Sequence, residues 1–313
     1  MADLRSWSAA VRPLVSVVVP THDRPTLLRR ALDAVLAQQY AGGIEVIVVF
    51  DRSSPETCLE QGRPDRVVRV LANTRTPGLA GSRNTGILAA GGDLVAFCDD
   101  DDVWLPGKLE RQVHALAEQP WAEFCTTAMT VDCAGRLTPR LAHTGQVTHE
   151  QLVRSRMAML HSSSFLVDRA ALVEGIGLVD ETLPQSMAED WDLLLRASAR
   201  EPVLHVDEPL VRVTWGATSY FAQQWQVRNE SQLWLLAHHP AMRRDRVGAA
   251  HAYGKLAFGC AAQGRRHDAV RWILRSWRTN WREPRAYLAL AVTVGLVRWD
   301  RLLAFLNARG HGV

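Results

Sequence analysis

The sequence predicts an α/β fold in which helices flank a mainly parallel sheet, followed by an α-helical C-terminal region. Continuous apolar runs at 14–19, 44–50 and 94–98 are rich in β-branched residues, a pattern typical of strands buried on both faces. Segments with apolar residues at three- and four-residue spacing alternate with these runs, and after about residue 219 only the helical spacing continues. Strands that alternate with helices favour a parallel sheet with right-handed crossovers.

The first expected strand ends at Pro20. Arg24-Pro25 is expected to open a helix that continues through 26–39, with proline in its first turn. The other expected strands are short β-rich runs: 44–50, 67–71, 94–98, 121–131, 164–167, 203–206 and 210–214. The other expected helices are segments of helical periodicity: 80–90, 108–118, 169–174, 188–200, 223–238, 247–263, 266–279 and 283–308. Residues 136–149 are expected to be irregular and 175–187 to form a loop. We therefore expect one domain over 1–218 and a helical domain over 219–313.

Composition excludes several classes of protein. A formal charge of +3 over 313 residues, with 47% hydrophobic content, is ordinary for a globular chain and indicates no nucleic-acid partner. The five cysteines form no CxxC pair and follow no signal peptide, so we expect free thiols and a cytoplasmic location. The apolar run at 286–297 is shorter than the roughly 20 residues that span a bilayer, so no transmembrane segment is expected.

Four consecutive carboxylates, 99–102, follow the apolar run at 94–98. Adjacent acids repel one another at the end of a buried strand, and Mg²⁺ or Mn²⁺ together with phosphate oxygens would neutralise them. Thr21, Asp23 and Asp51 follow the first two strands, and ligands of parallel sheets bind beyond the carboxyl ends of strands. The sequence therefore predicts a metal–diphosphate site, with an acidic solvated turn as the alternative.

Five separated motifs resemble the family-two glycosyltransferases: VSVVVPT at 15–21, VVFD at 48–51, GSRNTG at 81–86, FCDDDDVW at 97–104 and EDW at 189–191. The resemblance covers about 14–214. It implies a GT-A fold and an inverting, metal-dependent transfer from a nucleoside diphosphate sugar. Residues 1–218 would then form the nucleotide-sugar-binding catalytic domain, and 219–313 would bind the acceptor or mediate oligomerisation.

The resemblance also implies contacts with the donor nucleotide. Pro20, Thr21 and Asp23 would line the nucleoside pocket. Asp51 would accept a hydrogen bond from N3–H of uracil or thymine, so the donor is expected to be a UDP- or dTDP-sugar. Arg83 would meet the base or the diphosphate, since a guanidinium matches phosphate geometry.

The remaining implied roles concern the metal and the reaction. Asp99 and Asp100 would lie near the ribose, and Asp101 would ligate Mn²⁺ or Mg²⁺. Asp190 would act as general base with support from Glu189, at a helix start that favours its ionised form.

His161 and Trp191 are candidates for contact with the acceptor or the transferred sugar, and a structural role is equally open for His161. The sequence departs from the family pattern where Phe50-Asp51 replaces an acidic pair and where Asp100 fills the variable position of the Asp-x-Asp element. The second departure leaves open which acid of 99–102 contacts the metal.

The sequence leaves two other functions open. A nucleotidyltransferase would share the metal–nucleotide site, but it usually has a glycine-rich loop after the first strand, and residues 21–25 contain no glycine. A non-catalytic nucleotide-binding or scaffold protein would not need the complete acidic set. For the transferase, a polysaccharide, a lipid-linked glycan, a peptide and a small molecule all remain open as acceptors.

Overall fold

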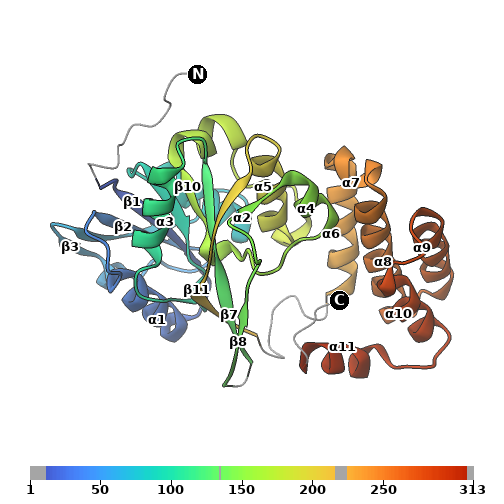
Figure 1. Ribbon diagram of the computed structural model, residues 1–313. Helices are drawn as coiled ribbons and strands as arrows, with labels where there is room; N and C mark the ends of the chain where they lie inside the picture. The colour runs from blue at the N-terminus through green and yellow to red at the C-terminus, as the bar shows by residue number, and fades with distance from the viewer. Residues whose placement is uncertain (1–11, 134, 216–223, 309–313) are drawn as a thin grey trace. The chain divides into compact units, whose positions relative to one another are not determined.

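The computed structural model describes residues 12–133, 135–215 and 224–308, which divide into two compact units (Figure 1). The first unit comprises described residues up to 149 together with 157–182 and 189–215. The second comprises 150–156, 183–188 and 224–308. The boundary expected after residue 218 lies outside the described residues.

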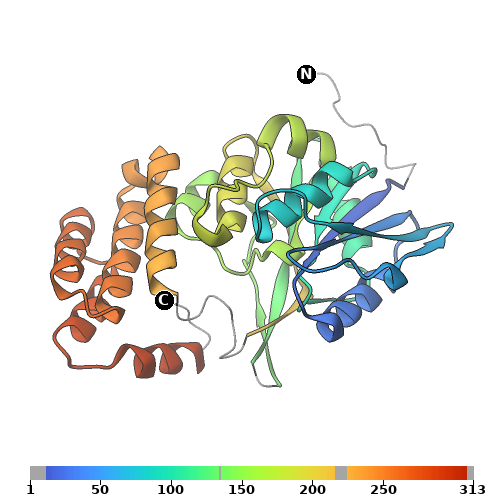
Figure 2. The same cartoon turned by 180° about the vertical axis from the view of Figure 1, so that it is seen from behind.

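The first unit is built on an 11-stranded sheet, whose main order is β3-β4-β2-β1-β5-β10-β7-β11-β6 (Figures 1 and 2). Its parallel half consists of β4 (Arg66–Ala72), β2 (Ile44–Phe50), β1 (Val15–Thr21) and β5 (Leu94–Phe97). Every residue of β1, β2 and β5 is buried. The predicted α/β class with a mainly parallel sheet is therefore confirmed.

The other half of the sheet is mixed. The strand β7 (Phe124–Cys133) runs parallel to β11 (Val203–Thr214), whereas β10 (Leu166–Asp168) is antiparallel to both β5 and β7. The short strands β3 (Gln61–Arg63), β6 (Val103–Trp104), β8 (Arg136–Arg140) and β9 (Gln146–Val147) each pair antiparallel with one neighbour.

Two expectations for this half were wrong. Residues 136–149 are not irregular, because β8 pairs with β7, β9 pairs with β11, and α4 (His149–Arg154) begins at the end of this segment. The two strands expected at 203–206 and 210–214 are one strand, β11, whose register with β7 shifts on both sides of Pro209. A bulge lets the ladder continue past a residue that has no N–H to donate.

Helices cover both faces of the parallel half. One face, with Val17 of β1, packs against α1 (Pro25–Leu36) and α3 (Lys108–Glu118) in a single apolar cluster. The opposite face, with Val18, packs against α2 (Leu79–Ala89). A Cβ at Gly86 of α2 would lie 2.4 Å from Val18 Cγ1, so this close approach requires glycine. The helix α5 (Glu189–Ser198) belongs to the same unit.

Short helical turns of the first unit are η1 (Thr57–Leu59), η2 (Ser162–Ser164) and the π-helical η3 (Ala171–Ile176), whereas η4 (Pro184–Ser186) belongs to the second unit. The predicted helix at 169–174 corresponds to η3, and the predicted loop at 175–187 contains η4.

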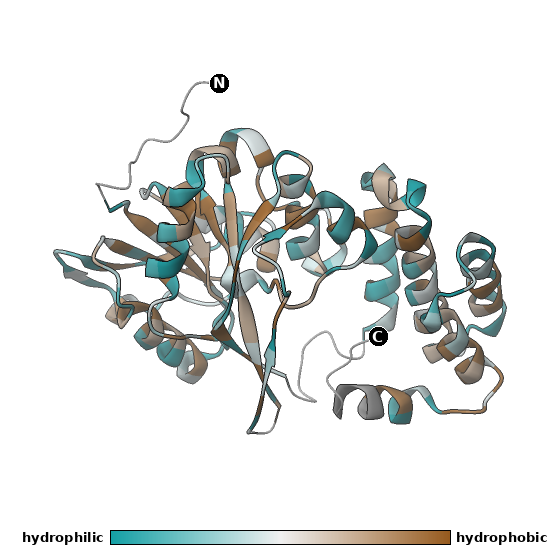
Figure 3. Cartoon of the chain, in the orientation of Figure 1, coloured by the Kyte–Doolittle hydropathy of each residue, from teal (hydrophilic) through white to brown (hydrophobic). Residues whose placement is uncertain are grey.

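The second unit is helical: α6 (Trp225–His238), α7 (Pro240–Arg244), α8 (Arg246–Ala262), α9 (Arg266–Thr279), α10 (Pro284–Thr293) and α11 (Trp299–Ala308). In this unit α8 contacts α6, α7, α9 and α10. Hydrophilic and hydrophobic segments are mixed along these helices (Figure 3). The single helix expected over 283–308 was wrong, because Gly295, at φ 80°, separates α10 from α11. Among the described helices, none combines the length and the apolar character needed to cross a membrane.

Candidate functional site

Polar side chains gather at the carboxyl edge of the parallel strands, as expected for a ligand site. The Thr21 hydroxyl at the end of β1 donates to Asp100 Oδ2 at 2.8 Å. Two non-glycine residues that follow strands at this edge, Asp23 after β1 and Arg52 after β2, have positive φ of 53° and 49°. Such conformations persist where surrounding structure imposes them, and they concentrate at binding sites. Pro20 lies within β1, and the side chain of Asp23 is exposed.

The four acids at 99–102 do not share one environment. Arg24 donates from Nη1 to Asp100 Oδ1 at 3.2 Å and to Asp101 Oδ2 at 2.9 Å. Burial, and then the charges of Asp99 and Asp100, raise the pKa of Asp101. Sequence reasoning missed the role of Arg24, although a basic residue in the loop after β1 was a candidate partner for four adjacent carboxylates.

Arg83 connects the acidic stretch to the start of α5. Its side chain is 1% exposed on α2, and it donates from Nη2 to Asp99 Oδ1 at 2.6 Å and from Nη1 to Glu189 Oε1. Burial lowers the pKa of Arg83, but the charges of Asp99 and Glu189, with a smaller contribution from Asp190, outweigh burial and raise it. Residues 106 positions apart in sequence are thereby held in one site.

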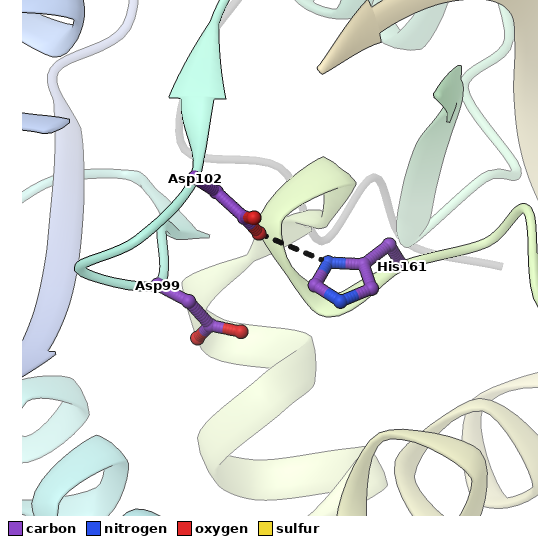
Figure 4. Close-up of side chains that lie close together, drawn as sticks. All are labelled: Asp99, Asp102 and His161. Atoms are coloured by element: carbon purple, nitrogen blue, oxygen red, sulfur yellow. Dashed lines mark ion pairs between the residues drawn. The ribbon is translucent and has the colours of Figure 1, made fainter. Parts of the chain in front are cut away.

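Asp99, Asp102 and His161 form a candidate metal centre (Figure 4). One ligand atom from each lies within 4.8 Å of the others, and His161 Nδ1 is 3.2 Å from Asp102 Oδ2. Burial raises the pKa of Asp102 well above its usual range, and the charges of Asp99 and Asp101 add to this effect. A buried carboxylate, a half-buried carboxylate and an imidazole suit a divalent cation, and its positive charge would stabilise the ionised form of Asp102. Asp101, the predicted ligand, lies outside this group, and its metal contact stays a prediction.

A layer of serine hydrogen bonds holds Asp99 and Asp102 in position. The Ser163 hydroxyl donates to Asp102 Oδ2 at 2.5 Å and accepts from the Asp99 N–H at 3.0 Å, and the Ser162 hydroxyl donates to Asp99 Oδ2 at 3.0 Å. Trp104 Nε1 donates to the Ser163 carbonyl at 2.8 Å. The serine run beside His161 was visible in the sequence, but nothing there connected it to the acids.

Lys108 supports this layer through two contacts. Its fully buried Nζ lies 3.8 Å from the centre of the Trp104 ring and donates to Gln112 Oε1 at 2.8 Å. Gln112 Nε2 in turn donates to the carbonyl of Ser164, in the same short helix η2, at 2.8 Å. Burial lowers the pKa of Lys108 to about 7.

Asp51 is 5% exposed, and its carboxylate accepts several hydrogen bonds. Oδ1 accepts from Asn73 Nδ2 at 2.8 Å and from the Gly78 N–H at 3.1 Å, while Oδ2 accepts from Arg52 Nε at 2.8 Å. Burial raises the pKa of Asp51, but these hydrogen bonds outweigh burial and hold the pKa below its usual range. Recognition of a base by Asp51 stays a prediction.

The start of α5 carries the predicted catalytic acids. Glu189 and Asp190 are each 5% exposed, and Asp190 Oδ1 accepts from the Trp191 N–H at 2.7 Å. Trp191 is only 1% exposed, so its ring packs in the protein interior, and its contact with a sugar stays a prediction. The catalytic role of Asp190 likewise stays a prediction.

The fold is that of the GT-A glycosyltransferases. The chain is similar to S. aureus TarS 1-349 in complex with UDP-GlcNAc, with a TM-score of 0.60 and 19% identity over 95% of this chain and 92% of the other. It is also similar to the mannosyltransferase PcManGT from Pyrobaculum calidifontis in complex with GDP-Man and Mn²⁺, with a TM-score of 0.56 and 19% identity over 98% of this chain and 83% of the other. Residues 16–175 match the family described as Glycosyl transferase family 2, and the chain belongs to that family.

Two named relatives each match about a third of the chain. The UDP-Glc:alpha-D-GlcNAc-diphosphoundecaprenol beta-1,3-glucosyltransferase WfgD of Escherichia coli is 36% identical over 33% of this chain and 41% of its own length. The GalNAc(5)-diNAcBac-PP-undecaprenol beta-1,3-glucosyltransferase of Campylobacter jejuni is 37% identical over 34% of this chain and 35% of its own length. The chain thus matches less than half the length of each of these relatives.

Proposed function

We propose that this protein is an inverting glycosyltransferase that moves a sugar from a uridine or thymidine diphosphate sugar to an acceptor hydroxyl. The observation that carries the proposal is the position of Arg83, which pairs with Asp99 on one side and Glu189 on the other. It holds a carboxylate cluster suited to a metal–diphosphate site beside a second pair of acids, Glu189 and Asp190. A donor site and a general base in one place are what a single displacement needs.

The chain's own residues would bind the donor at the carboxyl edge of the sheet. The turns with positive φ at Asp23 and Arg52, with Asp51 directly after β2, suit a nucleoside. We assign a divalent cation to Asp99, Asp102 and His161, and Asp101 becomes a ligand only where Arg24 releases its Oδ2. When bound, such a cation would neutralise the charge that grows on the departing diphosphate.

The proposed reaction is a single displacement at the anomeric carbon. The acceptor oxygen forms a bond to that carbon while the bond to the diphosphate oxygen breaks, and the nucleoside diphosphate leaves with the electron pair. The acceptor proton passes to the Asp190 carboxylate. One displacement inverts the configuration, so the protein needs no covalent nucleophile.

The test combines donor binding with turnover. Thermal shifts are measured with UDP-, dTDP- and GDP-sugars, with and without Mn²⁺, because a ligand of the folded state raises the melting temperature. Nucleotide release from the stabilising donor is then measured with saccharide acceptors. We expect a uridine or thymidine donor to stabilise the protein in a Mn²⁺-dependent manner, and we expect Asp102→Asn to remove that dependence.

Asp190→Asn should bind the donor normally and lower turnover by about 10²- to 10⁴-fold, the usual size of a general-base contribution. Asp192→Asn is the matched control, since Asp192 is buried in the same helix and its Oδ2 pairs with Arg196 at 2.8 Å. That control should turn over normally per folded molecule. Near-normal transfer by Asp190→Asn would reject the base assignment, and an absence of stabilisation by any sugar nucleotide would reject the function.

A further inference from the structure

Exposed apolar side chains are concentrated in the helical unit. Of thirteen large hydrophobic residues exposed in the described chain, nine lie between Leu233 and Val297. The most exposed of these are Leu296 at 78%, Trp281 at 64% and Val294 at 59%, and Tyr287 is 47% exposed. Water-exposed groups of this size that lie together usually mark an interaction surface.

Four of these exposed residues lie in α10 or within three residues of its ends, and we call them the apolar row: Trp281, Tyr287, Val294 and Leu296. Tyr287 and Val294 are seven residues apart, so they lie on one face of the helix, and this face is separate from the buried stripe that contains Ala286, Ala289 and Thr293.

Hydrogen bonds hold the two ends of the apolar row against α10. The Tyr287 hydroxyl donates to the Trp281 carbonyl at 2.7 Å, and the Leu296 N–H donates to the Ala291 carbonyl at 2.9 Å. The backbone at Trp281 and at Leu296 is thereby held next to α10.

The helical segment that carries the apolar row has an excess of positive charge. Residues 224–308 contain 14 arginines and lysines but only five acids, whereas the rest of the chain has more acids than bases. The Arg282 guanidinium lies 5.2 Å from the centre of the Trp281 ring. Within the described parts of the chain, no carboxylate forms an ion pair with Arg271, Arg278 or Arg282, so their charge is available to a partner.

We propose that the apolar row and its flanking arginines form a docking surface for an anionic lipid membrane. Trp and Tyr favour the headgroup region of a bilayer, aliphatic side chains enter the acyl boundary, and arginines attract anionic headgroups. A second copy of the same face is a poor occupant, because it would bring two sets of unpaired arginines together. Membrane docking would place the proposed transferase beside a lipid-linked acceptor; that consequence rests on the proposed function, whereas the docking does not.

The experiment is co-flotation of the full chain with vesicles of phosphatidylcholine, with or without phosphatidylglycerol, in the absence of donor and acceptor. We expect binding to the anionic vesicles only, weakened by salt. Arg278→Gln with Arg282→Gln should weaken that binding about 30-fold, as two basic residues near an anionic surface do. Trp281→Ser with Leu296→Ser should weaken it by about tenfold or more.

Matched controls make the same changes in the first unit. Leu137→Ser in β8, where Leu137 is 51% exposed, and Arg63→Gln in β3, where Arg63 is exposed, should leave vesicle binding unchanged. The proposal is overturned by equal binding to both kinds of vesicle, by row and arginine variants that bind like the wild type, or by row variants that only convert a dimer to a monomer. Because flotation requires no turnover, failure of the docking and failure of sugar transfer are separately visible.

Discussion

Replacement of Arg83 by methionine tests the central contact of the site. Met is unbranched, flexible and apolar, so it occupies the place of the Arg methylene stem without the charge. The change removes the 2.6 Å bond to Asp99 and the bond to Glu189, and it removes a guanidinium that lies 5.2 Å from the centre of the Phe97 ring. One partner taken from a buried ion pair costs about 3–5 kcal/mol, because the remaining charge is left in a poorly solvated place.

We expect Arg83→Met to lower the free energy of unfolding by about 3 kcal/mol, the low end of that range. The Asp99 side chain is 20% exposed and keeps the hydrogen bond from Ser162, so part of its charge remains solvated. Glu189, at 7%, is less accessible to water. In the Arg83→Met background, Glu189→Gln should therefore recover stability, by about 1–2 kcal/mol, since the uncompensated charge is gone.

The stability lost in Arg83→Met, which we call the deficit, should also depend on pH. Burial raises the pKa of Asp99, but Arg83 and His161 outweigh burial and lower it. In the wild type the stabilisation from Asp99 is complete above its unfolded pKa of about 3.9 and is lost as pH falls through the lower folded value. Without Arg83, burial raises the pKa of Asp99 above its unfolded value, so Asp99 takes up a proton on folding once pH falls below the raised folded pKa. The stability that Arg83→Met loses should therefore shrink as pH falls from neutral towards the unfolded pKa of about 3.9.

The assay is a urea titration read by pulsed hydrogen exchange of peptides from α2 and β5, because two compact units need not unfold together. Arg69→Met is the control, since Arg69 is 44% exposed and pairs with Glu45 at 3.6 Å. It should cost at most about 1 kcal/mol. A deficit below about 1 kcal/mol for Arg83→Met, or no recovery with Glu189→Gln, would refute the reasoning.

Two further predictions concern packing around the site. Because burial lowers the pKa of Lys108 to about 7 while the unfolded side chain keeps its proton to about pH 10, the free energy of unfolding should rise by about 2 kcal/mol between about pH 7 and pH 9. Lys108→Met should lack this rise in denaturation curves, and an unchanged pH dependence would contradict it. Gly86→Ala, whose Cβ would lie 2.4 Å from Val18 Cγ1, should cost about 1–3 kcal/mol, whereas Gly62→Ala, which has nothing within 4 Å, should be near neutral in the same measurement.

The elements that depend on local pattern were predictable from the sequence. The strand β2 and the helices α3 and α9 have the predicted bounds, because apolar runs and amphipathic spacing state directly which faces are buried. The strand β8 was missed because its sequence, RLTPR, has no strand pattern of its own and forms a ladder only through β7. The continuity of β11 past Pro209 was missed for the same reason, since its partner is 78 or more residues away.

The sequence by itself determined the fold class, the family resemblance and the edge of the sheet where acids would gather, because a strand's end and its next residues are adjacent in the chain. Only the tertiary structure decided how the four acids divide: Asp100 and Asp101 beside Arg24, Asp99 beside Arg83, and Asp102 beside His161. Those partners come from a loop, a helix and a turn far apart in sequence. The ionisation of each carboxylate depends on distances of a few ångströms to these partners, and the order of residues in the chain does not specify those distances.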